Sequence, residues 1–163
     1  MLGLCDALAM VLLETRGFRQ EDFAELHPGG SLGKYLLTRV SDIMRTGSSL
    51  PRVSQHALIQ DTVSAMLESR AGAAVIMDHE NKLAGIFTHG DFVRGYQVNQ
   101  KIGDSPVADL MTTSPITVQE DDLAAEVIRI LREHRIDDLV VINTSKEVVG
   151  LIDVQDLSRH GLG

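Results

Sequence analysis

Two short stretches of the sequence place a polar side chain three residues before an aspartate: "GIFTHGD" at residues 85–91 and "GLIDVQD" at residues 150–156. The second keeps the glycine, the apolar pair and the final aspartate of the first, but it has Asp153 where the first has Thr88. In both, apolar residues predict a strand and the aspartate marks the start of a helix. An aspartate at such a junction is the expected N-cap. The free N–H groups of a helix start also attract an anion such as phosphate.

The two stretches belong to an internal repeat. Residues 58–92 align with residues 123–157 at a constant offset of 65 and without a gap. Upstream, "VSDIMRT" from Val40 aligns with "VADLMTT" from Val107 at an offset of 67. Self-similarity sustained over this length indicates a duplicated structural unit.

Each unit is predicted to have the order β-α-β-β-α. Apolar residues such as Leu58, Val63 and Met66 recur at helical spacing, and two β-rich runs follow them. Five polar residues separate these runs, which suits a hairpin loop. The expected strands cover residues 51–54, 73–77 and 83–87 in the first unit and residues 115–118, 139–142 and 148–152 in the second. The expected fold class is therefore α+β.

The small size of each unit predicts that the two pack together. A chain of about 60 residues buries only about 60% of the surface that it exposes when unfolded, so it is marginal alone. We therefore expect a pseudo-twofold pair, with the sheets near one another and clefts between the units. Gly85 and Gly150 lie within expected strands, where glycine often marks the close approach of another backbone. The expected division is residues 1–34, then units at 35–100 and 101–163.

Composition narrows the classes of function. The chain has 163 residues and a formal charge of −8, which disfavours a general nucleic-acid surface. No apolar run reaches the ~18 residues that would span a membrane. A single cysteine, Cys5, fits a reducing cytoplasm. The histidines show no metal-ligand spacing, and no P-loop or acyl-transfer motif is present. We expect a cytoplasmic protein with no cofactor, no metal, and neither nucleic acid nor membrane as a partner.

The doubled unit, the "DIM" and "DLM" near each start and the G-h-h-T-x-x-D pattern resemble a tandem pair of CBS domains, a Bateman module, over about residues 40–160. The resemblance implies a regulatory module that binds adenosyl or other nucleotide ligands in a cleft. It implies that Thr88 contacts phosphate or ribose, and that Asp91 accepts hydrogen bonds from the ribose hydroxyls. Asp156 takes the same place in the second cleft. Such charge-assisted bonds contribute about 1.5–3 kcal/mol each.

Two interpretations of these aspartates stay open, ligand binding and helix capping. Arg94 and Arg159 follow their aspartates by one helical turn and are close enough to reach the same anion. Asp153, a carboxylate in place of a hydroxyl, repels phosphate, so the first cleft is the expected nucleotide site. The candidate ligand-binding residues are Thr88, His89, Gly90, Asp91, Arg94, Asp153, Asp156 and Arg159.

Residues 1–34 lie outside the repeat. "LGLCDALAMVLLETRGF" predicts an amphipathic helix that ends at Gly17, and "EDFAELHPGGSLG" follows. Together with "DIM" and "TG", this stretch resembles the end of the sugar-isomerase (SIS) domain of bacterial D-arabinose 5-phosphate isomerases. The resemblance implies interconversion of D-ribulose 5-phosphate and D-arabinose 5-phosphate for the synthesis of Kdo. It gives His27 a catalytic role in the full-length parent only. In the 163 residues, His27 is expected in an exposed loop, and we expect no isomerase activity from them alone.

Two functional hypotheses follow. In the first, a nucleotide or nucleotide sugar binds between the units and regulates the attached isomerase domain. CMP-Kdo is the candidate by pathway logic, and an adenine nucleotide is the candidate by family resemblance. In the second, the pair is a structural oligomerisation module with vestigial clefts. Both hypotheses expect a homo-oligomer, either a dimer or a tetramer.

Overall fold

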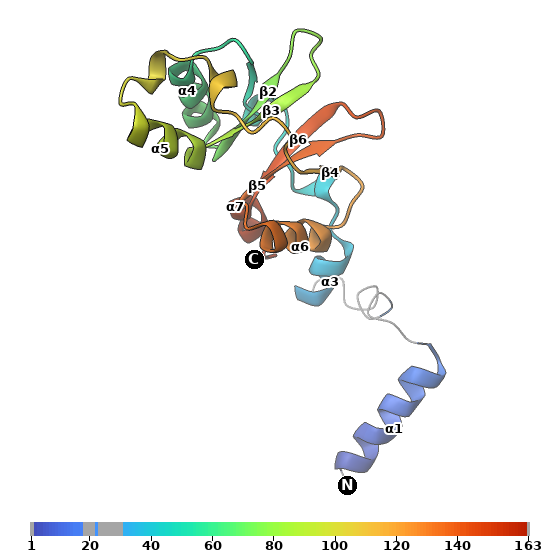
Figure 1. Cartoon of the computed structure of the whole chain (residues 1–163). Helices are drawn as coiled ribbons and strands as arrows, with labels where there is room; N and C mark the ends of the chain where they lie inside the picture. Colours follow the sequence, from blue (N-terminus) through green and yellow to red (C-terminus); the bar gives the residue numbers. More distant parts are fainter. Residues whose placement is uncertain (1, 18–21, 23–30, 163) are drawn as a thin grey trace.

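The computed structural model describes residues 2–17, 22 and 31–162. Two helices, α1 (Leu2–Thr15) and α3 (Ser31–Leu37), precede the repeated part of the chain. Helix α1 stands apart from the rest (Figure 1), and apolar side chains such as Leu8 and Met10 are exposed on it. A helix is therefore present where one was predicted, but it ends at Thr15 instead of Gly17, and the side chains of residues 5–17 are all exposed rather than divided into a buried and an exposed face. Helix α3 is an element that the sequence analysis did not predict. The stretch that contains His27 lies outside the described residues.

Both repeated units have the predicted order of elements. The first unit contains β1 (Arg52–Ser54), α4 (Ile59–Ser69), β2 (Ala73–Met77), β3 (Leu83–Thr88) and α5 (His89–Val98). The second contains β4 (Thr117–Gln119), α6 (Ala124–His134), β5 (Asp138–Ile142), β6 (Val148–Asp153) and α7 (Val154–Arg159). The prediction of an α+β fold made of two β-α-β-β-α units is confirmed.

The two sheets have the same topology. In each, the middle strand pairs in parallel with the first strand and antiparallel with the third. The antiparallel pair is a hairpin whose loop has one residue with positive φ, Asn81 in the first unit and Lys146 in the second. These are the polar loops that the sequence predicts, and asparagine tolerates this left-handed conformation better than most residues do.

Two short segments, one around Arg45 before β1 and one around Thr112 before β4, are called the leading segments here. Each leading segment pairs with the third strand of the other unit. Thr112 exchanges backbone hydrogen bonds with Ile86 of β3, and Arg45 does so with Leu151 of β6. Glycine in these strands makes room for the segments. A Cβ atom at Gly85 would lie 2.6 Å from the carbonyl oxygen of Thr112, and one at Gly150 would lie 2.5 Å from the sulfur of Met44. The close approach predicted at both glycines is confirmed.

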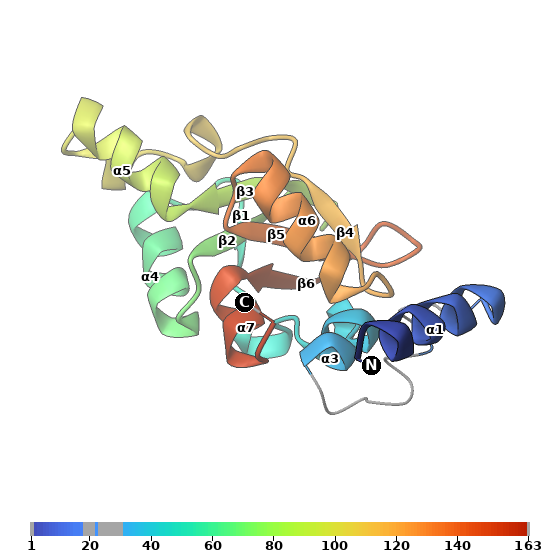
Figure 2. The ribbon, with the colours of Figure 1, turned by 90° about the horizontal axis from the view of Figure 1, so that it is seen from below.

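The sheets also share a core. Buried residues of both sheets, including Val75 and Ile86 of the first and Val140 and Leu151 of the second, form one apolar cluster. Each unit has a further cluster beneath its helices, with Met66 and Phe87 in the first and Val127 and Leu139 in the second. The two sheets therefore lie against each other as the predicted pair, with helices on their outer sides (Figure 1), and α6 lies over the strands when the molecule is seen from below (Figure 2).

Candidate ligand-binding cleft

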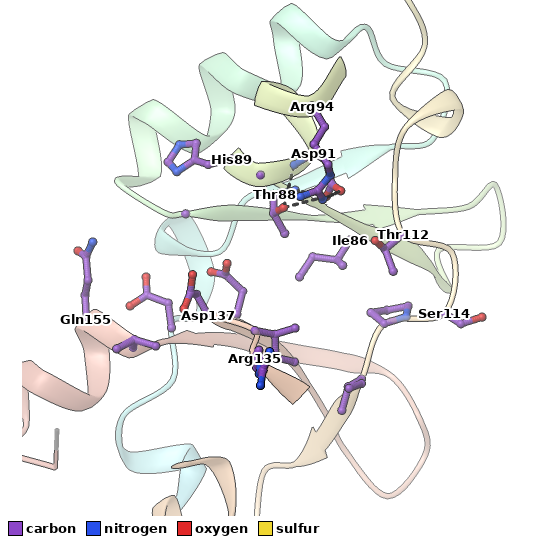
Figure 3. Close-up of a pocket in the computed structure, with 18 residues that line it drawn as sticks. Ile86, Thr88, His89, Asp91, Arg94, Thr112, Ser114, Arg135, Asp137 and Gln155 are labelled. Atoms are coloured by element: carbon purple, nitrogen blue, oxygen red, sulfur yellow. Dashed lines mark hydrogen bonds and ion pairs between the residues drawn. The ribbon is translucent and has the colours of Figure 1, made fainter. Parts of the chain in front are cut away.

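A cavity of about 740 Å³ lies between the two units. Its first wall is the junction of β3 and α5, with Thr88 and the residues that follow it. Its second wall consists of the segment before β4, the start of β5 and the junction of β6 and α7 (Figure 3). The volume is within the range of about 300–1,000 Å³ that small-molecule sites occupy.

Thr88 and Asp91 form a closed hydrogen-bonded pair at the start of α5. The Thr88 hydroxyl accepts a hydrogen bond from the backbone N–H of Asp91 at 3.2 Å and donates to Asp91 Oδ2 at 2.8 Å. The backbone N–H of Thr88 donates to the same carboxylate oxygen at 2.9 Å. This is a capping box, in which Thr88 is the N-cap and Asp91 is the third helical residue. The interpretation of Asp91 as the N-cap itself was therefore wrong, because the helix begins at His89.

Asp91 lines the cavity although it is only 8% exposed. Its second oxygen, Oδ1, accepts a hydrogen bond from Arg94 at 2.7 Å, and the Arg94 side chain is itself largely exposed. The exposed His89 and the half-buried Gly90 complete this wall, so five of the predicted site residues lie together here, and a sixth, Asp153, lines the opposite wall of the same cavity. Arg94 donates to Asp91 through Nη2, and its exposed side chain also lines the cavity.

The second unit has the same capping box with an acidic N-cap. Asp153 Oδ1 accepts from the backbone N–H of Asp156 at 2.9 Å, and Asp156 Oδ2 accepts from the backbone N–H of Asp153 at 3.2 Å. The N-cap is Asp153, so the interpretation of Asp156 as the N-cap was also wrong. Arg159 donates to Asp156 Oδ1 at 3.2 Å. Asp153 and Asp156 are both 5% exposed.

Arg45 supplies the charge that balances these two buried carboxylates. Its Nε donates to Asp156 Oδ2 at 2.7 Å and its Nη2 donates to Asp153 Oδ2 at 2.8 Å. Its Nη1 donates to the carbonyl oxygens of Ser69 and Arg70 at 3.2 and 2.9 Å. The guanidinium group is buried, and it fills the place beside the second capping box that the cavity occupies beside the first.

Arg45 was not among the predicted site residues, although the sequence contains a signal for it. In the repeat, Arg45 aligns with Thr112 and Asp153 aligns with Thr88. The first cleft therefore has threonine at both positions, and the second has an arginine and an aspartate that bond to each other. Asp153 was expected to repel a ligand's phosphate. The structure gives it a partner within the chain instead.

Asp138 is a further cavity residue that the sequence analysis did not identify. It is half-buried at the start of β5, opposite Asp153 in the antiparallel pair, and its Oδ1 would lie 3.2 Å from a Cβ placed on Gly72. Burial, together with the negative charges of Asp153 and Asp137, raises the pKa of the Asp138 carboxyl to about 7. Within residues 2–17, 22 and 31–162, its buried Oδ1 has no hydrogen-bond partner.

The same part of the chain contains no group of three or more histidine, cysteine, aspartate or glutamate residues placed to hold a metal ion. Among these described residues, no helix is long and apolar enough to cross a membrane. The residues that line the cavity between the two units offer hydrogen-bonding groups and charges to a ligand.

The chain is similar to curated arabinose 5-phosphate isomerases named KdsD. It is 40% identical to the one from Pseudomonas aeruginosa over 99% of this chain and 49% of the relative. It is 38% identical to the one from Escherichia coli K12 with the same two coverages. The chain thus spans about half the length of the curated relatives that it matches.

Solved structures share the fold. A conserved protein from Pyrococcus horikoshii matches with a TM-score of 0.69 and 25% identity, over 77% of this chain and 93% of that chain. The CBS domain pair of MJ0100, solved with 5′-methylthioadenosine and S-adenosyl-L-methionine, matches with a TM-score of 0.66 and 24% identity, over 75% and 94%. CBSX2, solved with AMP, matches with a TM-score of 0.65 and 23% identity, over 76% and 96%.

A model of the CBS domain matches residues 40–97 and 107–163, which include both structural units and both capping boxes. The predicted tandem pair is confirmed, and the chain belongs to the CBS domain family.

Proposed function

We propose that the chain is a regulatory ligand-binding CBS pair that binds a nucleotide or nucleotide sugar between its units. The observation that carries this proposal is the cavity of about 740 Å³, whose walls come from both units. A ligand in such a place contacts two bodies at once, so its binding energy depends on how they sit relative to each other. That dependence is what regulation by a ligand requires.

The ligand class is supported by two structural neighbours and by the wall at α5. MJ0100 was solved with adenosyl ligands and CBSX2 with AMP. The start of α5 has the positive end of a helix dipole, beside Thr88 and the exposed Arg94, which favours a phosphate. Asp137 on the opposite wall adds negative charge. We therefore expect AMP to bind more tightly than ATP, whose additional phosphates the acidic wall repels.

CMP-Kdo remains the proposed physiological ligand if the chain belongs to a D-arabinose 5-phosphate isomerase. One support is the similarity to KdsD proteins. The other is pathway logic, because feedback inhibition lets a late product of a pathway slow an early enzyme of the same pathway. Neither argument depends on a residue that reads cytosine. The ligand panel must therefore include CMP-Kdo and CMP beside AMP, ATP and S-adenosyl-L-methionine.

The test is ligand binding by thermal shift and calorimetry, with a variant that fills the cavity. We expect at least one ligand of the panel to raise Tm, and Thr112→Arg to remove that response because it places in the first cleft the arginine of the second. The matched control is Thr113→Arg, which adds the same charge at an exposed neighbour that does not line the cavity. No response of the unmodified chain to any of these ligands at millimolar concentration would overturn the proposal.

At the level of the whole protein, we propose that the ligand regulates an isomerase domain. A ligand does this only by binding two states of the protein unequally. The test is turnover of D-ribulose 5-phosphate by the full-length protein with and without the bound ligand, at substrate concentrations around KM. His27 acts only in that protein in this proposal, and the 163-residue chain alone is expected to show no turnover.

The alternative function, an oligomerisation module, has its own observation. Val93, Tyr96 and Val98 are 53%, 47% and 90% exposed on α5, so this helix presents apolar side chains outward. Both oxygens of Asp91 also have partners within the chain, as a purely structural role would require. Light scattering separates the two functions, because the alternative expects the same oligomer with and without ligand and no binding to the panel.

A further inference from the structure

We propose that Arg45 permanently occupies the second cleft as a built-in substitute for a ligand, so that each chain binds one ligand, in the first cleft. The count of one rests on the proposed function. The occupation of the second cleft by Arg45 rests on the geometry alone and can be tested separately.

The guanidinium group of Arg45 joins the two units. On one side it donates to the carbonyl oxygens of Ser69 and Arg70, at the C-terminal end of α4 in the first unit. On the other side it donates to Asp153 and Asp156 at the N-terminal end of α7 in the second unit. A cation is favourable at both places, because helix C-terminal carbonyls carry partial negative charge and the oxygens of Asp153 and Asp156 accept hydrogen bonds from it.

The corresponding place in the first cleft is open. Thr112, which aligns with Arg45, is exposed and lines the cavity. The groups on either side are equivalent to those that bind Arg45: the Thr88 box on one side and the end of α6 at His134 and Arg135 on the other. Arg135 has the same left-handed conformation as Arg70, with φ of 54° and 51°. The two clefts thus have equivalent groups on either side, but only the second cleft is filled by a side chain of the protein.

We expect that a ligand does not displace Arg45 from the second cleft. Its removal would leave Asp153 and Asp156, which are both 5% exposed, without their cation. Breaking a buried ion pair by removing one partner strongly destabilises a protein, because the other charge is left buried without compensation. A phosphate ligand would also bring more negative charge to the same two carboxylates. The second cleft is therefore closed to the class of ligand that the first one accepts.

The test is to exchange the residue pairs between the clefts and count AMP molecules by isothermal titration calorimetry. The unmodified chain is expected to bind one AMP. The double variant Arg45→Thr/Asp153→Thr gives the second cleft the threonine pair of the first, and it is expected to bind two. The reciprocal variant Thr88→Asp/Thr112→Arg is expected to bind no AMP. If the first variant does not fold, this second variant tests the inference by itself. Two AMP molecules on the unmodified chain, or unchanged counts in the folded variants, would overturn the inference.

A measurement without ligand separates this inference from the proposed function. The side-chain Nε–H resonance of Arg45 in NMR is expected to exchange slowly with water and to shift on Asp156→Asn, because Asp156 accepts its hydrogen bond. If the unmodified chain binds no AMP, ligand sensing of this nucleotide fails while a protected Arg45 proton still supports the occupied cleft. An Arg45 proton that exchanges as fast as that of the exposed Arg132 refutes the occupied cleft, whatever the calorimetry shows.

Discussion

At the scale of single residues, Asp138 has an environment that differs from that of its counterpart in the repeat. Ala73 holds the equivalent position in the first unit, where no charge has to be buried. In the second unit the carboxyl lies near Asp153 and Asp137, and Arg45 offsets these charges only in part. The folded chain therefore holds a proton on Asp138 to a higher pH than the unfolded chain does.

This raised pKa predicts a pH dependence of stability with a definite sign. The carboxyl titrates near pH 3.8 when unfolded and near pH 7 when folded, so the free energy of unfolding falls as pH rises between these values. Each pKa unit corresponds to about 1.4 kcal/mol, which limits the loss to about 4 kcal/mol. Asp138→Ala is expected to flatten this decline and to stabilise the chain at pH 8. Urea unfolding from pH 4.5 to 8 measures this pH dependence for the unmodified chain and for the variant.

The control for Asp138→Ala is Asp109→Ala, which removes an exposed aspartate from the segment before β4. It accounts for the change in net charge and for the titration of the remaining carboxylates. If both variants show the same pH profile as the unmodified chain, the assignment of a raised pKa to Asp138 is wrong.

At the scale of elements, the sequence predicted what depends on neighbours along the chain. The strand at residues 73–77 was predicted to the residue, because five consecutive apolar side chains between polar stretches allow little else. Helix α3 was missed, since it has no apolar periodicity over two full turns and Tyr35 is held by packing against the second unit. Arg45 was missed for a similar reason: its partners lie 108 and 111 residues away, and only the paired exchange in the repeat points to them.

The glycines of the cavity region yield a prediction for the elements that contain them. Gly85→Ala is expected to destabilise the chain by about 1–3 kcal/mol, because its Cβ would meet backbone of the leading segment at 2.6 Å and overpacking costs that much. Gly90→Ala is the matched control, because the nearest atom to its Cβ would be the end of the flexible Arg94 side chain at 3.1 Å, with the Thr88 hydroxyl in ordinary contact at 3.5 Å. In a helix, alanine is favoured over glycine by about 0.5–1 kcal/mol. Urea unfolding should separate the two, and equal midpoints would contradict the close approach at Gly85.

At the scale of the whole molecule, the two units are joined in three ways. Their sheets share an apolar cluster, each leading segment pairs with the other unit's third strand, and Arg45 bonds to both. A unit separated from its partner would expose that cluster and leave the segment unpaired. The pair is therefore expected to unfold as one cooperative body, and a ligand bound as proposed would act on that body as a whole.

This coupling predicts that damage to one unit is felt equally in the other. Phe87→Ala removes a fully buried ring from the first unit, which typically costs about 3–5 kcal/mol. Native-state hydrogen exchange should then show the same loss of protection for amides of β2 and of β5, since both open only through unfolding of the whole pair. Val98→Ala, at a side chain that is 90% exposed on α5, is the control and should change neither. Protection lost in β2 but retained in β5 would mean that the units fold independently. The ligand would then have to transmit its effect through the cavity walls alone.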